Sequence, residues 1–375
     1  MTPGPSTAPE NRAVRSNNRL ASLDWLRGIA SVWVLFYHLD VTMQKEKYFA
    51  AQPLSDLAAV GYRGVDLFFL LSGFVMTLTL YGSKKERLHG MADFAIRRVF
   101  RIFPLYLIVF IALFVAAAIT GVGGPEGFVP TISNFVWNAL LLPRDDLTTY
   151  IPVSAWTLTH ELMFYSMCIF GFYSKRLFWI LLAVWSALCL LHFAGGSSVK
   201  NWAMPLSPLN IYFLLGAACA MLTRYLKTQN AFAWLGGGLL FLVFAIYLET
   251  QYFGSGNRTP YDAIVYASGF FAMTLSMAIF TTGNRSLLAR ILHYLGEISY
   301  ALYLLHYPII VVVAMVVSRV DAGPIGQISF VFLSIAVTLV ASTLSFRLIE
   351  NPGISLGKMA SKKAMAQLTH NAVPA

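Results

Sequence analysis

Charged residues are scarce in this chain: Asp, Glu, Lys and Arg make up 12% of its 375 residues, against about 25% in an ordinary soluble domain. The mean hydropathy is +0.65, and the apolar residues gather in runs of about 20, enough to cross a bilayer core of ~30 Å at about 1.5 Å per residue. These two observations exclude a soluble globular protein and a disordered one.

Cysteine is almost as rare. The three cysteines, Cys168, Cys189 and Cys219, lie inside apolar runs and lack the spacing of metal ligands. A disulfide scaffold is therefore excluded, and we expect the three thiols to pack among apolar neighbours. The sequence predicts no metal cofactor, because no zinc-type spacing of Cys or His is present.

The chain instead contains ten long apolar stretches, which predict an all-α polytopic bundle of about ten transmembrane helices. An even number of spans places both termini on one side of the membrane. The expected spans are residues 24–43, 63–82, 101–120, 156–173, 177–194, 208–226, 231–249, 262–282, 297–318 and 326–347. Residues 131–142 are apolar but too few to cross, so we expect an interfacial or re-entrant helix there.

The positive charges indicate the orientation. With a cytoplasmic N-terminus, 20 of the 27 Lys and Arg residues fall in inner segments, as the positive-inside rule expects. The net charge of +10 thus reflects topology and attraction to anionic membrane lipids, not nucleic-acid binding. We expect a disordered cytoplasmic tail over residues 1–21, a membrane domain over 22–352 and a cytoplasmic tail over 353–375.

The first span carries a polar stripe. Arg27 and His38 are eleven residues apart, so they share one helical face at a separation of about 16 Å, and Asp24 lies one turn before Arg27 on that face. A charged side chain in a span costs ~2.5–3.5 kcal/mol. Arg27 can reach the inner head groups beside Asp24. His38 cannot, and it is either a hydrogen-bonded core histidine or a general base with a pKa near about 6.5.

Glu161 lies near the outer end of the fourth span, at a depth similar to that of His38. It is either a carboxylate reached by interfacial water or the partner that orients His38, as in other base and carboxylate pairs. His160 points about 100° away, and we expect it to face lipid head groups.

Arginines gather at the inner lip of the third span. Arg98 and Arg101 share a helical face, and Arg97 adjoins them. The cluster is either a cytoplasmic anchor or a binding site for a phosphate-bearing ligand, which arginine forks contact through two oxygens.

Asp24 and four other polar side chains are candidates for the lining of a cavity. Asp66 and Ser72 in the second span can serve helix packing or the cavity, and Ser72 lacks the glycine pattern of a hydrolase nucleophile. Tyr303 and His306 share a face near the middle of the ninth span, as a buried hydrogen-bonded pair or as cavity lining. We expect Glu350 to form a local ion pair with Arg347 at a helix end.

Six blocks occur in an order that resembles the acyltransferase 3 family of integral membrane acyltransferases. The resemblance covers roughly residues 22–352. The blocks are LDWLRGIA with FYH, GVDLFFLLSGF, RRVFRIFPLY, WTLTHELMFY, GEISYALYLLHYP and a closing ENP.

The resemblance implies transfer of an acetyl or other short acyl group from acetyl-CoA to a carbohydrate hydroxyl, often on a surface or exported polysaccharide or its lipid-linked precursor. It implies that Arg27 and His38 are the essential pair of the first span. Arg98 and Arg101 match the family's Arg-x-x-Arg motif on the CoA side, and Glu161 matches an acidic position. It also implies a multi-pass protein of the bacterial inner membrane. The short C-terminal segment leads us to expect no fused hydrolase-like domain.

Two other functions fit the same pattern. An acyltransferase acting on a small lipophilic acceptor such as a macrolide would carry the same motifs. A transporter or flippase would also place polar residues near the middle of its spans, but it would show Gly-broken helices in matched halves and no need for CoA.

Overall fold

The computed structural model describes residues 9–85, 87–121, 124–125, 127–144, 146–194, 204–254, 256, 260–280 and 286–371. Over these residues the chain forms helices, turns and loops without a β-strand, which confirms the predicted all-α class. The α-helices are α1 (Pro9–Gln44), α2 (Asp56–Ala59), α3 (Gly64–Gly82), α4 (Arg87–Thr120), α5 (Ile132–Ala139), α6 (Trp156–Tyr173), α7 (Lys175–Ala194), α8 (Ile211–Leu222), α9 (Ala231–Leu248), α10 (Pro260–Ile279), α11 (Leu287–Glu297), α12 (Ser299–Val320), α13 (Pro324–Ser345) and α14 (Asn351–Asn371). Short 3-10 helices span Gly61–Arg63, Leu147–Thr149, Val153–Ala155, Met204–Leu206, Pro208–Asn210 and Thr228–Asn230, and π-helical turns span Glu249–Phe253 and Phe346–Glu350.

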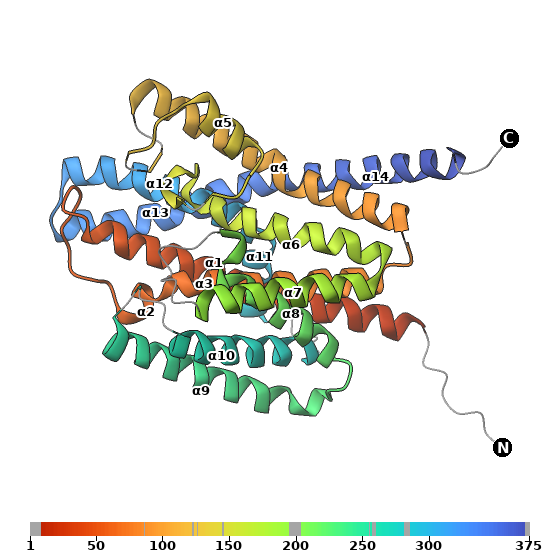
Figure 1. The fold of residues 1–375 in the computed structure, drawn as a ribbon. Coiled ribbons are helices and arrows are strands. Elements are labelled where there is room, and N and C mark those ends of the chain that lie inside the picture. The colour runs from red at the N-terminus through yellow and green to blue at the C-terminus, as the bar shows by residue number, and fades with distance from the viewer. Residues whose placement is uncertain are drawn as a thin grey trace, which may run out of the picture.

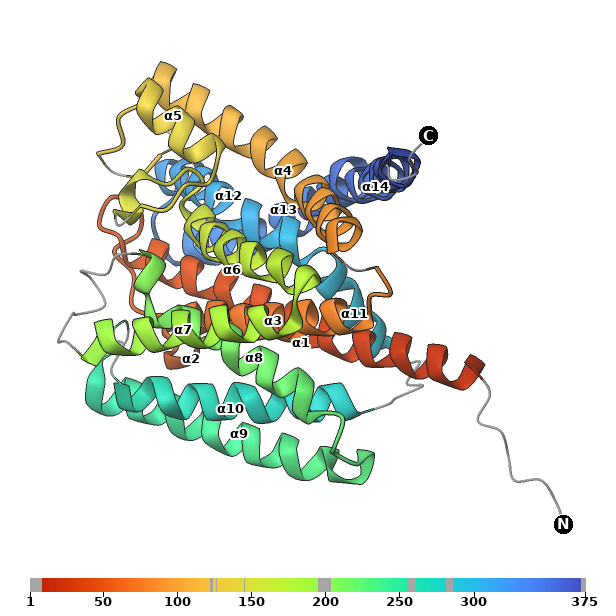
Figure 2. The ribbon, with the colours of Figure 1, turned by 45° about the vertical axis from the view of Figure 1, so that its right-hand side comes forward.

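The long helices run roughly parallel to one another (Figure 1). Helix α1 is the centre of the bundle, since it packs against α3, α10, α11 and α12. Helices α9 and α10 pair along one side, and α4 with α5 lies on the opposite side (Figure 2). Helix α1 begins and α14 ends at the same end of the bundle (Figure 1).

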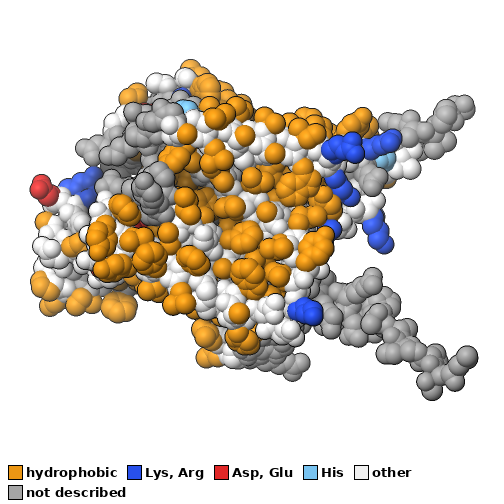
Figure 3. All heavy atoms as spheres, turned by 60° about the horizontal axis from the view of Figure 1, so that its bottom comes forward, with side chains coloured by type: hydrophobic (Ala, Val, Ile, Leu, Met, Phe, Trp, Pro, Cys, Tyr) orange, Lys and Arg blue, Asp and Glu red, His pale blue; other side chains and the backbone are white. Residues whose placement is uncertain are grey.

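Six stretches among the described residues are long and apolar enough to cross a membrane, in place of the ten that we predicted. The six stretches are Gly61–Gly82, Arg87–Thr120, Lys175–Ala194, Thr228–Phe253, Ser299–Val320 and Pro324–Thr369, and shorter apolar helices cover Pro208–Leu222 and Ala263–Ile279. Four predicted spans fall outside the six stretches. Two of them correspond to these shorter helices, and the other two lie in α1 and α6, which carry the polar residues His38 and Glu161. On the face shown in Figure 3, apolar side chains are spread over the middle, and most of the visible Lys and Arg side chains lie at the end where α14 emerges.

Small residues allow α3 and α8 to cross closely. A Cβ atom added to Gly73 would lie 2.2 Å from the carbonyl oxygen of Phe213, and one added to Gly216 would lie 1.9 Å from that of Leu70. Both distances are shorter than any tolerated contact, so glycine is required on each helix. The ring of Phe213 then stacks between those of Phe69 and Phe164, with centroids 4.9 and 4.5 Å away.

Both predicted tails differ from the structure. Residues 9–21 continue α1, because no Gly or Pro interrupts the chain between residues 10 and 27; residues 1–8 lie outside the described part. Residues 353–371 form most of α14, which packs along α4. There Ser361 donates a hydrogen bond to Asp93, and Gly357 lies against Phe100. The expected short helix within 131–142 is α5, and the three cysteines are free and buried, as predicted.

Candidate active site

A cavity lies among α1, α3, α4, α6 and α12 and collects most of the chemistry that the sequence singled out. Its charged lining residues are Arg27, Arg98, Arg101 and Glu161, three cations against one anion, a net formal charge of +2. Ser72 and Tyr303 also line it, as predicted. A partly dry cavity of this charge attracts anionic groups more strongly than an exposed surface does.

The arginines of the cavity are held by different contacts. Arg98 stacks its guanidinium over the rings of Phe94 and Tyr165, 5.4 and 5.3 Å from their centroids. Among the described residues neither Arg98 nor Arg101 has a carboxylate partner in an ion pair. Stacking leaves the N–H groups at the edge of a guanidinium available to a ligand.

Arg97 differs from its two neighbours. Its Nε atom donates to Oδ1 of Asp93 at 2.8 Å, and its side chain is 43% exposed. It is absent from the cavity lining. The adjacent position on the helix turns it about 100° away from Arg98, so the structure separates it from the other two arginines.

Glu161 is not the partner of His38. No hydrogen bond joins the two residues, both of which the structure describes. Glu161 instead accepts hydrogen bonds from Ser72 Oγ at 2.9 Å and from the hydroxyl of Tyr165. The prediction of this pair was wrong because α6 packs against α3, α4 and α7, while α12 lies against α1 and supplies the partner.

His38 pairs with His306. The Nδ1 atom of His38 lies 3.0 Å from the carbonyl oxygen of Val34 and 3.2 Å from Nε2 of His306. The Nδ1 atom of His306 lies 3.2 Å from the carbonyl oxygen of Leu302. The two rings meet edge to face, with centroids 4.8 Å apart.

These contacts assign the protons. A carbonyl oxygen can only accept, so each Nδ1 atom must carry the hydrogen. The Nε2 atom of His306 then has a lone pair that accepts from His38 Nδ1–H, which is shared with the carbonyl of Val34. The Nε2 atom of His38 therefore keeps its lone pair. This atom does not belong to the buried side-chain atoms that lack a hydrogen-bond partner. His38 is thus set up to accept a proton at Nε2.

The histidine pair lies beyond one wall of the cavity. Tyr303 lines the cavity, and its ring lies 5.7 Å from that of His306. Contrary to prediction, His306 and Asp24 are not lining residues. His306 is fully buried behind Tyr303, and Asp24 bonds outside the cavity, 3.7 Å from Arg27 and 3.3 Å from His293.

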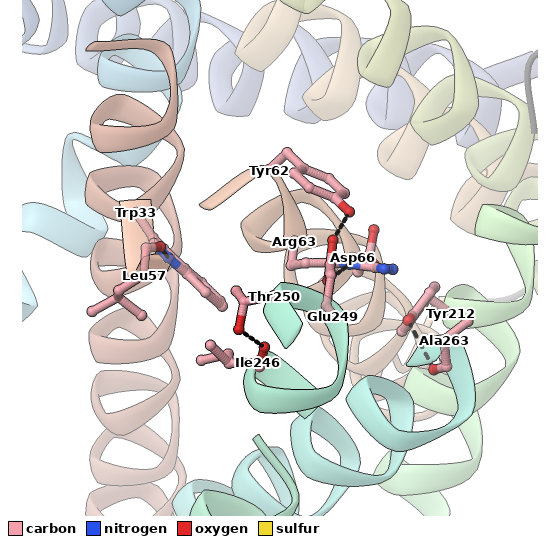
Figure 4. Close-up of polar contacts among 10 residues, drawn as sticks. All are labelled: Trp33, Leu57, Tyr62, Arg63, Asp66, Tyr212, Ile246, Glu249, Thr250 and Ala263. Carbon is pink, nitrogen blue, oxygen red and sulfur yellow. Dashed lines mark hydrogen bonds and ion pairs between the residues drawn. The ribbon is translucent and has the colours of Figure 1, made fainter. Parts of the chain in front are cut away.

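Asp66 is also absent from the cavity lining and belongs to a second polar cluster. It pairs with Arg63 at 3.4 Å, and Arg63 donates from Nε to Glu249 at 3.1 Å (Figure 4). All three side chains are fully buried. We did not predict Arg63 or Glu249 as part of a site. The sequence did contain one indication, because Glu249 is a charged residue at the end of an apolar run.

Two other sequence predictions were wrong. Glu350 forms no ion pair with Arg347: it is 1% exposed, and neither carboxylate oxygen has a hydrogen-bond partner. In an α-helix, Arg347 and Glu350 would share one face because they are three residues apart. The π-helical turn Phe346–Glu350 changes this spacing. His160 does not face the head groups but is buried, with Nδ1 2.7 Å from Oδ1 of Asn210.

The described residues contain no group of three or more His, Cys, Asp or Glu side chains that could hold a metal ion. The side chains that line or adjoin the cavity can bind an anion through arginine and accept a proton through an imidazole.

Comparison with known proteins places these residues in context. The model of the family described as "Acyltransferase domain" matches residues 20–347. "Putative peptidoglycan O-acetyltransferase YrhL" of Bacillus subtilis is 28% identical over 89% of this chain, and "O-acetyltransferase OatA" of Staphylococcus aureus is 26% identical over 89%. "Acyltransferase MdmB" of Streptomyces mycarofaciens is 26% identical over 90%.

The coverage of these relatives differs. The match spans 54% of YrhL and 57% of OatA, so this chain corresponds to a little over half of each. It spans 92% of MdmB. No solved structure matches the chain.

Proposed function

The chain belongs to the acyltransferase domain family, and from that premise we propose that it is a membrane enzyme that moves an acetyl group from acetyl-CoA to a carbohydrate hydroxyl. The observation that carries the proposal is that an anion-binding cavity and a proton-accepting histidine pair lie on either side of Tyr303. A cavity with three arginines lies on one side of it, and a histidine pair with a free lone pair lies on the other.

The arginine cavity fits the donor. Coenzyme A carries phosphates, and among the described residues neither Arg98 nor Arg101 forms an ion pair with a carboxylate. Charge-assisted contacts between guanidinium and phosphate are the stronger kind of hydrogen bond. Arg27, on the same lining, would meet the thioester arm farther in and stabilise the charge that develops on its carbonyl oxygen.

His38 fits the general base. As the acceptor hydroxyl attacks the thioester carbon, Nε2 of His38 takes its proton, and the new C–O bond forms while the C–S bond breaks. The imidazolium then returns the proton to the departing thiolate, which leaves as the free thiol of CoA. His306 orients His38 through Nδ1 and stabilises the imidazolium with its lone pair.

Glu161 has a different role from the one first expected. It holds Ser72 and Tyr165 in the wall of the cavity, and its charge offsets that of Arg27. We assign it to positioning the wall and balancing the arginines, since it makes no contact with His38.

The acceptor is a surface or exported polysaccharide, or its lipid-linked precursor. The similarity to YrhL and OatA, named as a putative peptidoglycan O-acetyltransferase and an O-acetyltransferase, supports this assignment. A small lipophilic acceptor such as a macrolide would use the same base and the same donor site. The basic end of the bundle would face the cytoplasm, in a bacterial inner membrane, with both termini on that side.

The test is acetylation by purified protein. The wild type should transfer label from acetyl-CoA to a saccharide acceptor, with a product heavier by one acetyl group. His38→Ala should lower the rate about 10²- to 10⁴-fold, the usual contribution of a general base. His89→Ala serves as the matched control, because His89 lies on α4 beside Thr369 and outside the cavity. Undiminished transfer by His38→Ala would refute the proposal.

A further inference from the structure

A second cavity, larger than the first, lies on another side of the bundle. It measures about 660 Å³ and runs between α7, α8, α9 and α10. Residues from Ala263 to Ala272 of α10 line it, a length of about 13 Å along the helix axis. We call it the lateral crevice. Its size is within the range of about 300–1,000 Å³ that is usual for ligand pockets.

The lateral crevice opens toward the surrounding lipid. Several of its lining side chains are also surface side chains: Leu190 is 53% exposed, Phe241 is 48% exposed and Ile264 is 66% exposed. Leu190 and Phe241 lie in stretches that are long and apolar enough to cross a membrane, and Ile264 lies in a shorter apolar helix. An apolar cavity does not retain water, so hydrocarbon is the medium that fills it.

The two hydroxyl groups in the wall of the crevice already form hydrogen bonds. Ser268 donates to the carbonyl of Ile264 at 2.9 Å, and Tyr212 donates to the carbonyl of Ala263 at 3.4 Å. Among the described residues of its wall, Arg63 is the only charged side chain, and it forms ion pairs with Asp66 and Glu249 (Figure 4). A neutralised arginine does not select an anion, so the wall favours an uncharged, apolar occupant.

The polar end of the crevice adjoins the residues around His38. Tyr62, next to Arg63, donates a hydrogen bond to Glu249, and its ring lies 5.4 Å from that of Tyr37. The ring of Tyr37 in turn lies 5.0 Å from that of His38. The rings of Tyr62 and Tyr37 therefore lie between the polar end of the crevice and His38, the proposed base.

We propose that the lateral crevice binds the hydrocarbon tail of a lipid-linked saccharide and so presents its sugar hydroxyl to His38. This inference rests on the proposed function and specifies its acceptor. The tail supplies affinity by burying apolar surface, and the saccharide remains outside the crevice, on the side of Tyr37. A bilayer phospholipid could fill the same space, but it would not present a sugar hydroxyl to His38.

The test compares two acceptors in nanodiscs of defined phospholipid, with the full chain and labelled acetyl-CoA. One acceptor is an isoprenoid-linked disaccharide, and the other is the same disaccharide with a methyl group in place of the tail. We expect KM to be at least about tenfold lower for the tailed acceptor. Ala267→Trp, which fills the crevice, should reduce this preference about tenfold or more. Ala187→Trp, on the exposed face of α7 and outside the crevice, should leave it unchanged.

A second measurement guards against a folding defect. The isoprenoid-linked disaccharide with a diazirine in its tail should crosslink to peptides of α9 and α10 in the wild type, and excess unlabelled acceptor should suppress the crosslink. A wild type that prefers neither acceptor, a crosslink that bulk phospholipid suppresses equally, or an Ala267→Trp variant with unchanged preference would overturn the inference. The absence of transfer to both acceptors would instead contradict the proposed function.

Discussion

Replacement of His306 by phenylalanine tests the assigned tautomers most directly. The change keeps an aromatic ring of similar size at a fully buried position but removes the Nε2 lone pair, which lies 3.2 Å from Nδ1 of His38. The lost contact matters most when His38 carries a proton, because a hydrogen bond to a charged group contributes about 1.5–3 kcal/mol. At about 1.4 kcal/mol per factor of ten, kcat should fall by roughly 10- to 150-fold.

The assay is steady-state acetyl transfer at saturating acceptor. KM for acetyl-CoA should stay unchanged, because His306 lies behind Tyr303 and outside the arginine cavity. His306→Gln, whose amide oxygen can accept from Nδ1, should recover part of kcat. In a His38→Ala background, His306→Phe should have no further effect, since its role passes through His38.

Two results would refute this reasoning. An unchanged kcat in a well-folded His306→Phe protein would show that the lone pair is not used. Additive losses in the double variant would show that His306 acts independently of His38.

The remaining predictions concern the donor site and the helix crossing. Arg98→Ala and Arg101→Ala should each raise KM for acetyl-CoA by about 10- to 100-fold, because each removes a charge-assisted contact. Arg97→Ala is the control and should leave KM unchanged. Equal effects of all three substitutions on KM would argue against the cavity as the donor site. Gly216→Val should destabilise the protein by about 1–3 kcal/mol or more through overpacking, seen as earlier thermal unfolding in detergent. Gly237→Ala, where an added Cβ meets nothing within 4 Å, should unfold no earlier than the wild type, and equal unfolding of the two variants would contradict the close crossing.

The fold class could be predicted because the bilayer leaves few solutions. A run of about 20 apolar residues in lipid must satisfy its own backbone, so length and composition indicate helices. The six recognised stretches are fewer than the ten predicted for two reasons. The apolar helices Pro208–Leu222 and Ala263–Ile279 are short, and α1 and α6 carry polar side chains such as His38 and Glu161, which lower the mean hydropathy by which a span is recognised.

The candidate site was only partly predictable. Residues on one helix, such as Asp24 and Arg27, could be placed by the helical period, and their contact was confirmed. The partner of His38 depended on which helix packs against α1, and neither depth nor spacing contains that information. Depth in the membrane suggested Glu161, whereas tertiary packing places His306 beside His38.

The position of Tyr303 has a consequence for the membrane itself. Tyr303 lines the arginine cavity and its ring lies 5.7 Å from that of His306, so a single aromatic side chain lies between the two parts of the proposed site. In the proposed reaction only a two-carbon fragment changes sides, and the bulky, phosphorylated carrier never leaves the cytoplasm. Such an enzyme can export acetyl groups without opening a water-filled path, so the ion gradient that the cell maintains is not dissipated by its turnover.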